Sequence, residues 1–166
     1  MKRILLSIGA LVTLTVLATA PGWLTSYDQA LKFAKKSRRP ILINFTGSDW
    51  CSWCKRMQTE SLGTREFVQF ASSNLLLVEL DFPNARPQSA EVKRVNGSLK
   101  DQFQITGFPT YVLVDADGRE LGRKVGYLKG GPEAMVATLT GWMDAAKPAA
   151  PGPSAATSAP AAPTAP

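Results

Sequence analysis

Two apolar runs, PILINF at residues 40–45 and LLLVELDF at residues 75–82, limit what this chain can fold into more than any other feature. Short continuous apolar runs of this kind suit strands that are buried on both faces. The stretch TREFVQFASS between them, residues 64–73, has the pattern of a short helix. Two strands that are joined by a helical crossover should lie parallel in one sheet. The pattern therefore predicts an α/β fold.

A turn signal near the other end predicts a second kind of strand pairing. The runs YVLVD, residues 111–115, and RELGRKV, residues 119–125, flank the tripeptide ADG, whose Asp-Gly step is typical of hairpins. Apolar stripes predict helices over residues 27–37 (YDQALKFAKKS) and 132–146 (PEAMVATLTGWMDAA). We therefore expect a mixed four- to five-stranded sheet, flanked by helices on both faces.

The stretch between the second apolar run and the hairpin gives weaker signals. Residues 83–97 are polar and irregular, and we expect no more than a helical turn near residues 90–95. The run SLKDQFQI, residues 98–105, predicts a separate short helix, and GFPT after it predicts a turn. This part of the chain is therefore predicted to be mostly loop.

The two ends of the chain do not have the pattern of a folded domain. Residues 1–20 begin with two cations, continue as an uncharged apolar run and end in small residues, which is the pattern of a secretory signal peptide. The run is nearly long enough to be an uncleaved membrane anchor instead. Residues 147–166 are rich in Ala and Pro and predict a disordered tail. One domain is therefore expected, over residues 21–146.

Charge and composition exclude several classes of function. The formal net charge is +6, but the basic residues are scattered and do not alternate with aromatic residues, so we expect a solvated surface and no nucleic-acid partner. The chain contains no histidine. This rules out zinc sites built on histidine, Ser-His triads and Cys-His proteases.

Both cysteines of the chain, Cys51 and Cys54, follow the first apolar run, with two residues between them, at the predicted start of a helix. A sulfur at a helix N-terminus is stabilised as a thiolate, and Cys-X-X-Cys thiols commonly titrate well below the ~8.5 of a free cysteine. Such a thiolate can attack a disulfide, and a second thiol three residues later can break the mixed disulfide that forms. The pattern favours Cys51 as the nucleophile and Cys54 as the more buried resolving cysteine.

Other interpretations of the pair remain open at this stage. A structural disulfide over so small a loop would stabilise the fold little. A metal site needs three or four ligands, and the chain has neither a second cysteine pair nor a histidine, so no metal site and no cofactor are predicted. Two thiolates can bind Cu(I) linearly, with Met57 as an extra soft ligand. A Cu(I) chaperone and a redox-inert interaction module are therefore the alternatives.

The motif WCSWCK after a strand, together with GFPT before the strand YVLVD and the closing hairpin and helix, resembles the thioredoxin superfamily. The resemblance covers residues 23–146, and the phrase FTGSDWC is most similar to exported bacterial thioredoxin-like proteins. It implies the thioredoxin fold. It also implies that the peptide bond before Pro109 is cis, that Pro109 lies against the sulfurs, and that the backbone of Phe108 pairs with a bound substrate. Trp50 is expected to shield the site, and both Trp50 and Trp53 to contact substrate.

Two features depart from the pattern of thioredoxin. Thioredoxin has a buried aspartate before the motif that accepts a proton from the second cysteine, and Asn44 stands at the matching position here. Glu79, in the second apolar run, could replace it if its side chain points towards the motif, although we favour a plain strand-end or edge residue. The second departure is the dipeptide Ser52-Trp53 between the cysteines, where residues tune the reduction potential.

We therefore predict an exported thiol–disulfide oxidoreductase that reduces or isomerises protein disulfides through the Cys51–Cys54 couple. Its partners would be proteins with disulfides or thiols, and a membrane or soluble thiol electron donor. It would reside in the periplasm or cell envelope, in contact with a membrane only if residues 1–20 remain attached.

Overall fold

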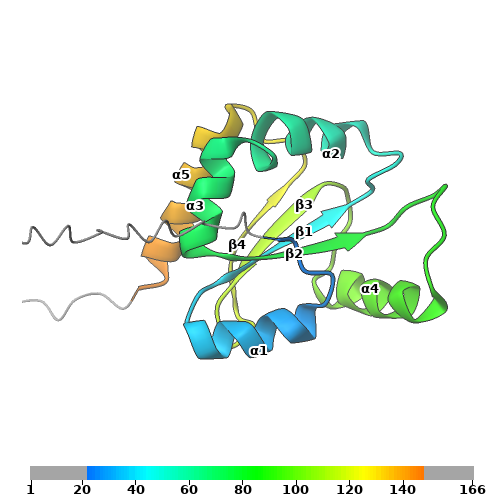
Figure 1. The fold of residues 1–166 in the computed structure, drawn as a ribbon, viewed down its shortest axis with the longest axis horizontal. Coiled ribbons are helices and arrows are strands. Elements are labelled where there is room, and N and C mark those ends of the chain that lie inside the picture. Colours follow the sequence, from blue (N-terminus) through cyan, green and yellow to red (C-terminus); the bar gives the residue numbers. More distant parts are fainter. Residues whose placement is uncertain (1–21, 148–166) are drawn as a thin grey trace, which may run out of the picture.

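A computed structural model describes residues 22–147 of the chain. In chain order the elements are α1 (Tyr27–Ser37), β1 (Ile41–Thr46), α2 (Ser52–Met57), the π-helix η1 (Gln58–Leu62), α3 (Arg65–Asn74), β2 (Leu76–Asp81), α4 (Ala90–Gln102), β3 (Thr110–Val114), β4 (Glu120–Val125) and α5 (Gly131–Ala145). Figure 1 shows α2, α3 and α5 on one side of the sheet and α1 and α4 on the other. The predicted mixed sheet with helices on both faces is confirmed.

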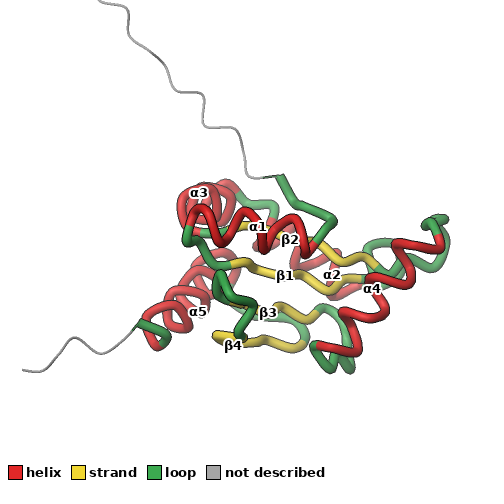
Figure 2. The backbone as a smooth tube through the Cα atoms, turned by 90° about the horizontal axis from the view of Figure 1, so that it is seen from below, coloured by secondary structure: helices red, strands yellow, loops and turns green. Residues whose placement is uncertain are grey.

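The four strands lie in the order β2-β1-β3-β4, which can be followed in Figure 2. β1 and β2 are parallel, as the helical crossover between them predicts. β3 is antiparallel to β1 and to β4, and the β3–β4 hairpin turns through the predicted Asp-Gly step. The carboxyl ends of β1 and β2 therefore lie side by side. β1 leads directly into the cysteine motif, and β2 leads into the 82–89 loop.

Each face of the sheet has its own apolar core. Side chains of α1 and α4 pack against the alternate residues of β1 that begin at Ile41, together with residues of β2 and β3. Side chains of α3, α5 and η1 pack on the opposite face, against Leu42, Leu77 and Leu113. This alternation is the period of two that a strand buried on both faces requires.

Three helices begin at a hydroxyl side chain that accepts the backbone N–H of the third residue beyond it. Ser26 caps α1, Thr64 caps α3 and Ser89 caps α4. The cap satisfies one of the backbone donors that the first turn of a helix leaves free. Helix α5 has no such cap and instead carries Pro132 in its first turn, where a missing N–H is harmless.

The expectation that residues 83–97 are mostly irregular, with a separate helix at residues 98–105, was wrong. The structure has one continuous helix, α4, over Ala90–Gln102. Asn96 and Gly97 have low helix propensity, but the Asn96 side chain is buried and its Nδ2 donates to the carbonyl of Asp81 at 3.0 Å. A tertiary hydrogen bond has therefore overridden the low helix propensity of these two residues.

A π-helical turn, η1, joins α2 to α3. Its last backbone bond runs from the N–H of Gly63 to the carbonyl of Gln58 at 2.7 Å. A β-carbon on Gly63 would lie 2.6 Å from that carbonyl oxygen, so only glycine fits here without a shift. Single π-turns are frequent at functional sites, and this one directly follows the cysteine helix.

The predicted signal peptide or anchor, residues 1–20, lies outside the described residues, and so does the predicted tail from residue 148 onward. Within residues 22–147 the longest helices are too short or too polar to span a bilayer. The segment before α1 is tied to the sheet, because Leu24 forms a parallel bridge with Val78 on the outer side of β2.

Candidate active site

The two cysteines lie where the sequence predicts, at the start of the helix that follows β1. Cys51 is the N-cap of α2, and its Sγ accepts the backbone N–H of Cys54 at 3.2 Å. The two are joined in a disulfide, with their Cα atoms 5.2 Å apart. Cys51 is 6% exposed and Cys54 is 5% exposed, so exposure alone does not separate their roles. Their surroundings differ, because Cys54 lines the cavity described below and Cys51 does not.

Ser48 fastens the loop before the cysteines to the end of β2. Its backbone N–H donates to one carboxylate oxygen of Asp81 at 2.9 Å, and its hydroxyl donates to the other at 2.5 Å. The Arg86 guanidinium contacts both the Ser48 hydroxyl and the Asp81 carboxylate. The loop is therefore held by a carboxylate at the end of β2 and by a guanidinium from the middle of the 82–89 connection.

Asp49 makes a second attachment between the same two loops. Its carboxylate accepts the backbone N–H groups of Asn84, Ala85 and Arg86 at 3.0, 2.8 and 3.2 Å. These bonds, the one from Asn84 above all, lower the pKa of Asp49 below its ordinary value. The Lys55 ammonium donates to the Asp49 carbonyl at 2.7 Å. The backbone that leads into Cys51 is thus fixed on both sides.

Trp50 stands beside the cysteines as an exposed aromatic wall. It is 45% exposed, and its indole N–H donates to the carbonyl of Phe82 at 2.8 Å. Its ring meets Phe108 edge-on at 5.7 Å, and Phe82 packs on Phe108 at 5.2 Å. Gly47 lies directly under the indole, where any β-carbon would overlap the ring. We call Trp50, Phe82 and Phe108 the tryptophan rim.

The turn before β3 brings two more predicted residues to this rim. The Phe108–Pro109 peptide bond is cis, as the resemblance implies. Pro109 is buried, and its carbonyl accepts the N–H of Gly126 at 2.7 Å, while the Thr110 hydroxyl closes the turn on Gly107 at 2.8 Å. Trp50 and Phe108 therefore meet although 58 positions separate them.

Trp53 faces a different side of the site and belongs to a cluster that sequence reasoning missed. It is 49% exposed and packs on Tyr127, with 5.2 Å between ring centroids. The Arg56 guanidinium lies over both rings, at 5.2 and 4.8 Å from their centroids. Glu60 accepts hydrogen bonds from Arg56 and from the Tyr127 hydroxyl. We call these four residues the Trp53 cluster.

The hydrogen bond between Tyr127 and Glu60 shifts the pKa of both groups. It raises the pKa of Tyr127 and, together with Arg56, lowers the pKa of Glu60. The spacings of Trp53 to Arg56 and of Arg56 to Glu60 are three and four residues, so helical periodicity could have found these two partners. Tyr127 comes from the segment after β4 and carries no local signal.

A cavity of about 450 Å³ lies on the inner side of Cys54, between α2 and the sheet. We call it the Cys54 cavity. Its lining residues come from the segment before α1, from β1 and β2, and from the α2–η1 helix: Trp23, Asn44, Thr46, Ser48, Cys54, Lys55, Gln58, Thr59 and Glu79. Most of these side chains are polar. A cavity of this size with several polar partners can hold water molecules.

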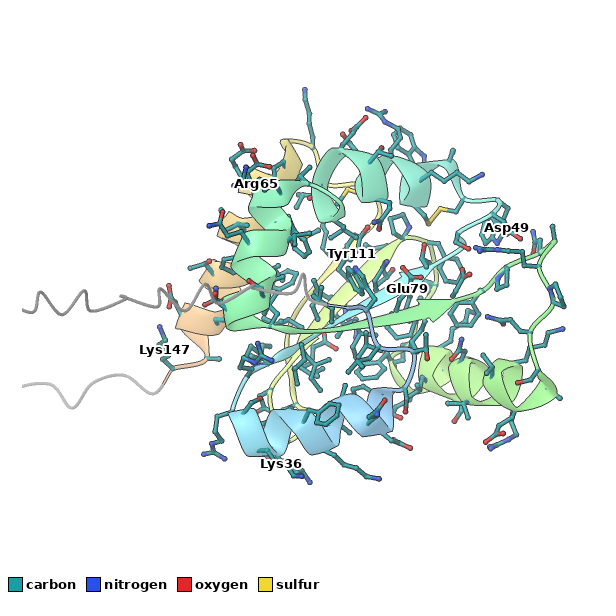
Figure 3. The ribbon with its side chains drawn as sticks, viewed as in Figure 1. Lys36, Asp49, Arg65, Glu79, Tyr111 and Lys147 are labelled. Carbon is teal, nitrogen blue, oxygen red and sulfur yellow. A yellow bond between two sulfur atoms is a disulfide. The ribbon has the colours of Figure 1, made fainter. Side chains whose placement is uncertain are left out.

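Glu79 points into this cavity. It lies directly opposite Asn44 in the β1–β2 register, and Figure 3 shows its carboxylate on the side of the sheet that faces α2. The favoured interpretation of Glu79 as a plain edge residue is right about its strand and wrong about the direction of its side chain. Strand β2 is the edge of the sheet, yet the Glu79 side chain faces inward and is partly buried.

The charges around the cavity keep Glu79 closer to its neutral form. Burial, and then the nearby Asp81 carboxylate, raise the pKa of Glu79, while Arg86 and a hydrogen bond with Asn44 oppose the rise. Burial also raises the pKa of Tyr111, which neighbours Glu79 on the same face. The Asn44 side chain is 3% exposed, and its Oδ1 has no hydrogen-bond partner among residues 22–147.

Within residues 22–147 no cluster of three or more His, Cys, Asp or Glu side chains has the geometry to hold a metal ion. The two thiols are paired with each other instead. The chemistry that this arrangement offers is thiol–disulfide exchange, with two exposed tryptophans next to the cysteines in the chain and a cavity that Cys54 lines.

Comparisons with known proteins agree with this geometry. The family model described as a thioredoxin-like domain matches residues 27–140. The protein named disulfide bond reductase DsbH, from Chlamydia pneumoniae, is 45% identical over 114 residues, which cover 69% of this chain and 68% of that protein. A solved structure titled DsbH oxidoreductase superposes with a TM-score of 0.72 at 38% identity, over 83% of this chain and 95% of that one. The predicted fold and superfamily are confirmed.

A second relative is more distant. The protein named thioredoxin-related protein DsbJ, also from Chlamydia pneumoniae, is 32% identical over 101 residues. These residues cover 61% of this chain but 29% of that protein, so this chain matches less than a third of DsbJ.

Proposed function

This chain belongs to the thioredoxin-like family of thiol–disulfide oxidoreductases, and from that premise we propose that it is an exported reductase of protein disulfides. The observation that carries the proposal is the Cys51–Cys54 disulfide at the start of α2, flanked by the tryptophan rim. The similarity to a protein named disulfide bond reductase favours reduction over isomerisation.

Cys51 is the attacking residue in this proposal. The backbone N–H that points at its Sγ would stabilise a thiolate, which lowers the free energy of the form that attacks. The Cys51 thiolate attacks one sulfur of the substrate disulfide, forms a mixed disulfide and expels the other substrate sulfur as a thiolate. Cys54 then attacks Cys51, restores the disulfide of the enzyme and releases the second substrate thiol.

The tryptophan rim and the Trp53 cluster are the surfaces that would receive the substrate chain. Trp50 and Trp53 are both about half exposed, although large apolar side chains usually avoid water. An extended segment of a substrate would lie along Phe108 and Pro109, with its disulfide over Cys51. The tryptophans would supply apolar contact area at a small cost in side-chain entropy.

Trapping of the mixed disulfide tests these assignments. In a Cys54→Ala protein, a disulfide-bonded peptide should form a stable adduct on Cys51, and the reduced wild-type protein should catalyse the reduction of insulin disulfides. If the adduct instead accumulates on Cys54 in a Cys51→Ala protein, the two roles are reversed. A protein that binds Cu(I) tightly but reduces no disulfide would point to the copper chaperone.

Export is part of the proposal and rests on the residues 1–20 pattern. In the envelope, the oxidised protein would need a thiol electron donor, membrane-bound or soluble, to return Cys51 and Cys54 to thiols. Mass spectrometry of the protein from a cell-envelope fraction would distinguish a cleaved chain from one that keeps an N-terminal anchor. A chain found only in the cytoplasm would refute export.

A further inference from the structure

The step in which Cys54 attacks the mixed disulfide needs an acceptor for the Cys54 thiol proton, since the thiolate is the nucleophile. Cys54 is 5% exposed, so bulk water reaches its sulfur poorly from outside. Its inner side borders the Cys54 cavity, into which Glu79 points from the sheet. The acceptor should therefore be sought among the titratable groups that face this cavity.

The other charged and titratable groups around Glu79 are engaged or unsuited. Asp81, two residues along the same strand, holds both donors of Ser48 and contacts Arg86. The Lys55 side chain, on α2, is engaged by the backbone carbonyl of Asp49, to which its Nζ donates. Tyr111, on β3, has a pKa raised by burial and stays protonated at neutral pH. Glu79 itself forms no ion pair within residues 22–147.

The unpaired oxygen of Asn44 is a second, independent observation. A fully buried acceptor without a partner costs about 1–3 kcal/mol, so such atoms are rare and call for an explanation. Asn44 is 3% exposed, lines the same cavity and lies opposite Glu79 in the strand register. An ionised carboxylate can offer this oxygen nothing, whereas a protonated carboxyl can donate its O–H to it. The Asn44 amide N–H can donate to the ionised carboxylate, and the Asn44 oxygen gains a donor once Glu79 carries a proton.

We propose that Glu79 accepts the Cys54 proton, through water in the Cys54 cavity, and that Asn44 positions the protonated carboxyl. This inference rests on the proposed reductase function and assigns the proton path of its second step. Burial and Asp81 raise the pKa of Glu79, which brings a carboxylate closer to the neutral range where a general base is most effective. Asn44 then acts as an orienting partner and not as an inert replacement for an acid.

The step balances as follows. The Cys54 thiol gives its proton through water to the Glu79 carboxylate, and its electron pair forms the new bond to the Cys51 sulfur. The bond between Cys51 and the substrate sulfur breaks, and the substrate leaves as a thiolate that takes a proton from solvent. Cys51 and Cys54 are oxidised to the disulfide, and the substrate disulfide has gained two electrons.

The test is the Glu79→Gln variant of the full chain, because glutamine keeps the size and hydrogen-bonding capacity but cannot take the proton. Decay of a preformed mixed disulfide between Cys51 and a peptide thiol should slow by about 10²-fold at pH 7, within the range of general-base catalysis. The wild-type rate should rise as Glu79 ionises and then level off, whereas the variant, which relies on solvent to ionise Cys54, should start lower and keep rising with pH. Glu66→Gln, which removes the same charge from the exposed surface of α3, should decay like wild type.

The rate of adduct formation on Cys51 distinguishes a failure of the proposed role of Glu79 from a failure of the proposed reductase function. In proteins that also carry Cys54→Ala, Glu79→Gln should leave the rate of adduct formation on Cys51 within about twofold of its Glu79 parent, because the proton path serves only the second step. Equal decay rates and pH profiles in Glu79→Gln and wild type would overturn the role of Glu79 and leave the reductase function standing. If wild-type Cys51 forms no adduct at all, both proposals fail.

A measurement on the unaltered protein covers the case in which Glu79→Gln fails to fold. The carboxyl carbon of Glu79, followed by NMR, should titrate in one step in the disulfide form. In the dithiol form it should show a second step that coincides with the ionisation of Cys54, because two linked groups titrate together. Identical titration curves in both redox forms would overturn the inference.

Discussion

The two faces of the sheet carry different kinds of side chain at equivalent positions. On the face that α1 and α4 cover, the buried residues of β1, β2 and β3 are apolar except Thr110 at the start of β3: Ile41, Ile43, Phe45, Val78, Leu80, Val112 and Val114. On the opposite face the strands begin apolar, at Leu42 and Leu77, and then turn polar beneath α2, at Asn44, Thr46 and Glu79. In the β1–β2 pair, the change from apolar to polar side chains falls between Leu42 and Asn44 on β1 and between Leu77 and Glu79 on β2.

This contrast separates the part of the protein that stabilises the fold from the part where the chemistry lies. Apolar burial contributes about 25 cal/mol for each Å² removed from water, whereas buried polar groups contribute only when paired. The polar end beneath α2 holds an unpaired amide oxygen and a partly buried carboxyl group. Proteins keep such unfavourable groups mainly at functional sites.

Neighbouring residues of β1 provide the sharpest test of this difference. Phe45→Ala removes a fully buried ring from the apolar face and should lower the free energy of unfolding by about 3–5 kcal/mol. Asn44→Ala, on the polar face, removes an acceptor that is already unpaired and should cost less than about 1.5 kcal/mol. Urea unfolding of both variants at pH 7 measures the difference.

The same two variants should also differ in the rate of the second reaction step, the attack of Cys54 on the mixed disulfide. Phe45→Ala should keep its rate of mixed-disulfide decay in the folded fraction, and Asn44→Ala should slow that decay, because Glu79 loses its positioning partner. Equal losses of stability in the two variants would mean that the polar face is structural, and the contrast between the faces would not hold.

The parts of this arrangement that could be predicted from sequence are those with a local signal. The strands of the parallel pair and the hairpin follow from apolar runs and an Asp-Gly turn, and the cysteine helix follows from its position after β1. Helix α4 was missed because the low helix propensity of Asn96-Gly97 is overridden by the hydrogen bond from Asn96 to Asp81. No local pattern encodes that bond.

The candidate site divides in the same way. Cys51, Cys54 and Pro109 stand in motifs, so sequence reasoning could name them. The direction of Glu79 depends on strand register, and a shift by one residue would turn the side chain to the other face. Tyr127 joins Trp53 only through the fold, because 74 positions separate them. Long-range geometry of this kind cannot be read from periodicity.

The raised pKa of Glu79 predicts that this residue lowers stability at neutral pH. Because burial raises the pKa above the ordinary value of 4.5, the folded state binds more protons than the unfolded state between the two pKa values, and stability falls as pH rises through that window. Glu79→Gln removes the buried charge. It should therefore unfold at higher urea concentration than wild type at pH 7, by a smaller margin than the Phe45→Ala loss.

The gain should shrink as the pH is lowered and disappear below about pH 4.5, where Glu79 is neutral in both states. Asp101→Asn, on the exposed surface of α4, removes one negative charge outside the cavity and should show no such gain. A stability advantage of Glu79→Gln that is constant from pH 3 to pH 8 would show that the buried charge is not its cause.

Asp49 should show the opposite sign, with a smaller effect. Three backbone N–H groups lower its pKa below the ordinary value of 3.8, so its contribution to stability is present above that value and lost as pH falls through the folded pKa. Asp49→Asn should therefore lower stability slightly at pH 7 and not at all near pH 2. Hydrogen exchange at Asn84, Ala85 and Arg86 should quicken locally, since the amide that replaces the carboxylate is a weaker acceptor with one oxygen. Asp49→Asn should lower stability at pH 7 and Glu79→Gln should raise it. A change in the same direction in both variants would contradict the opposite pKa shifts of the two carboxylates.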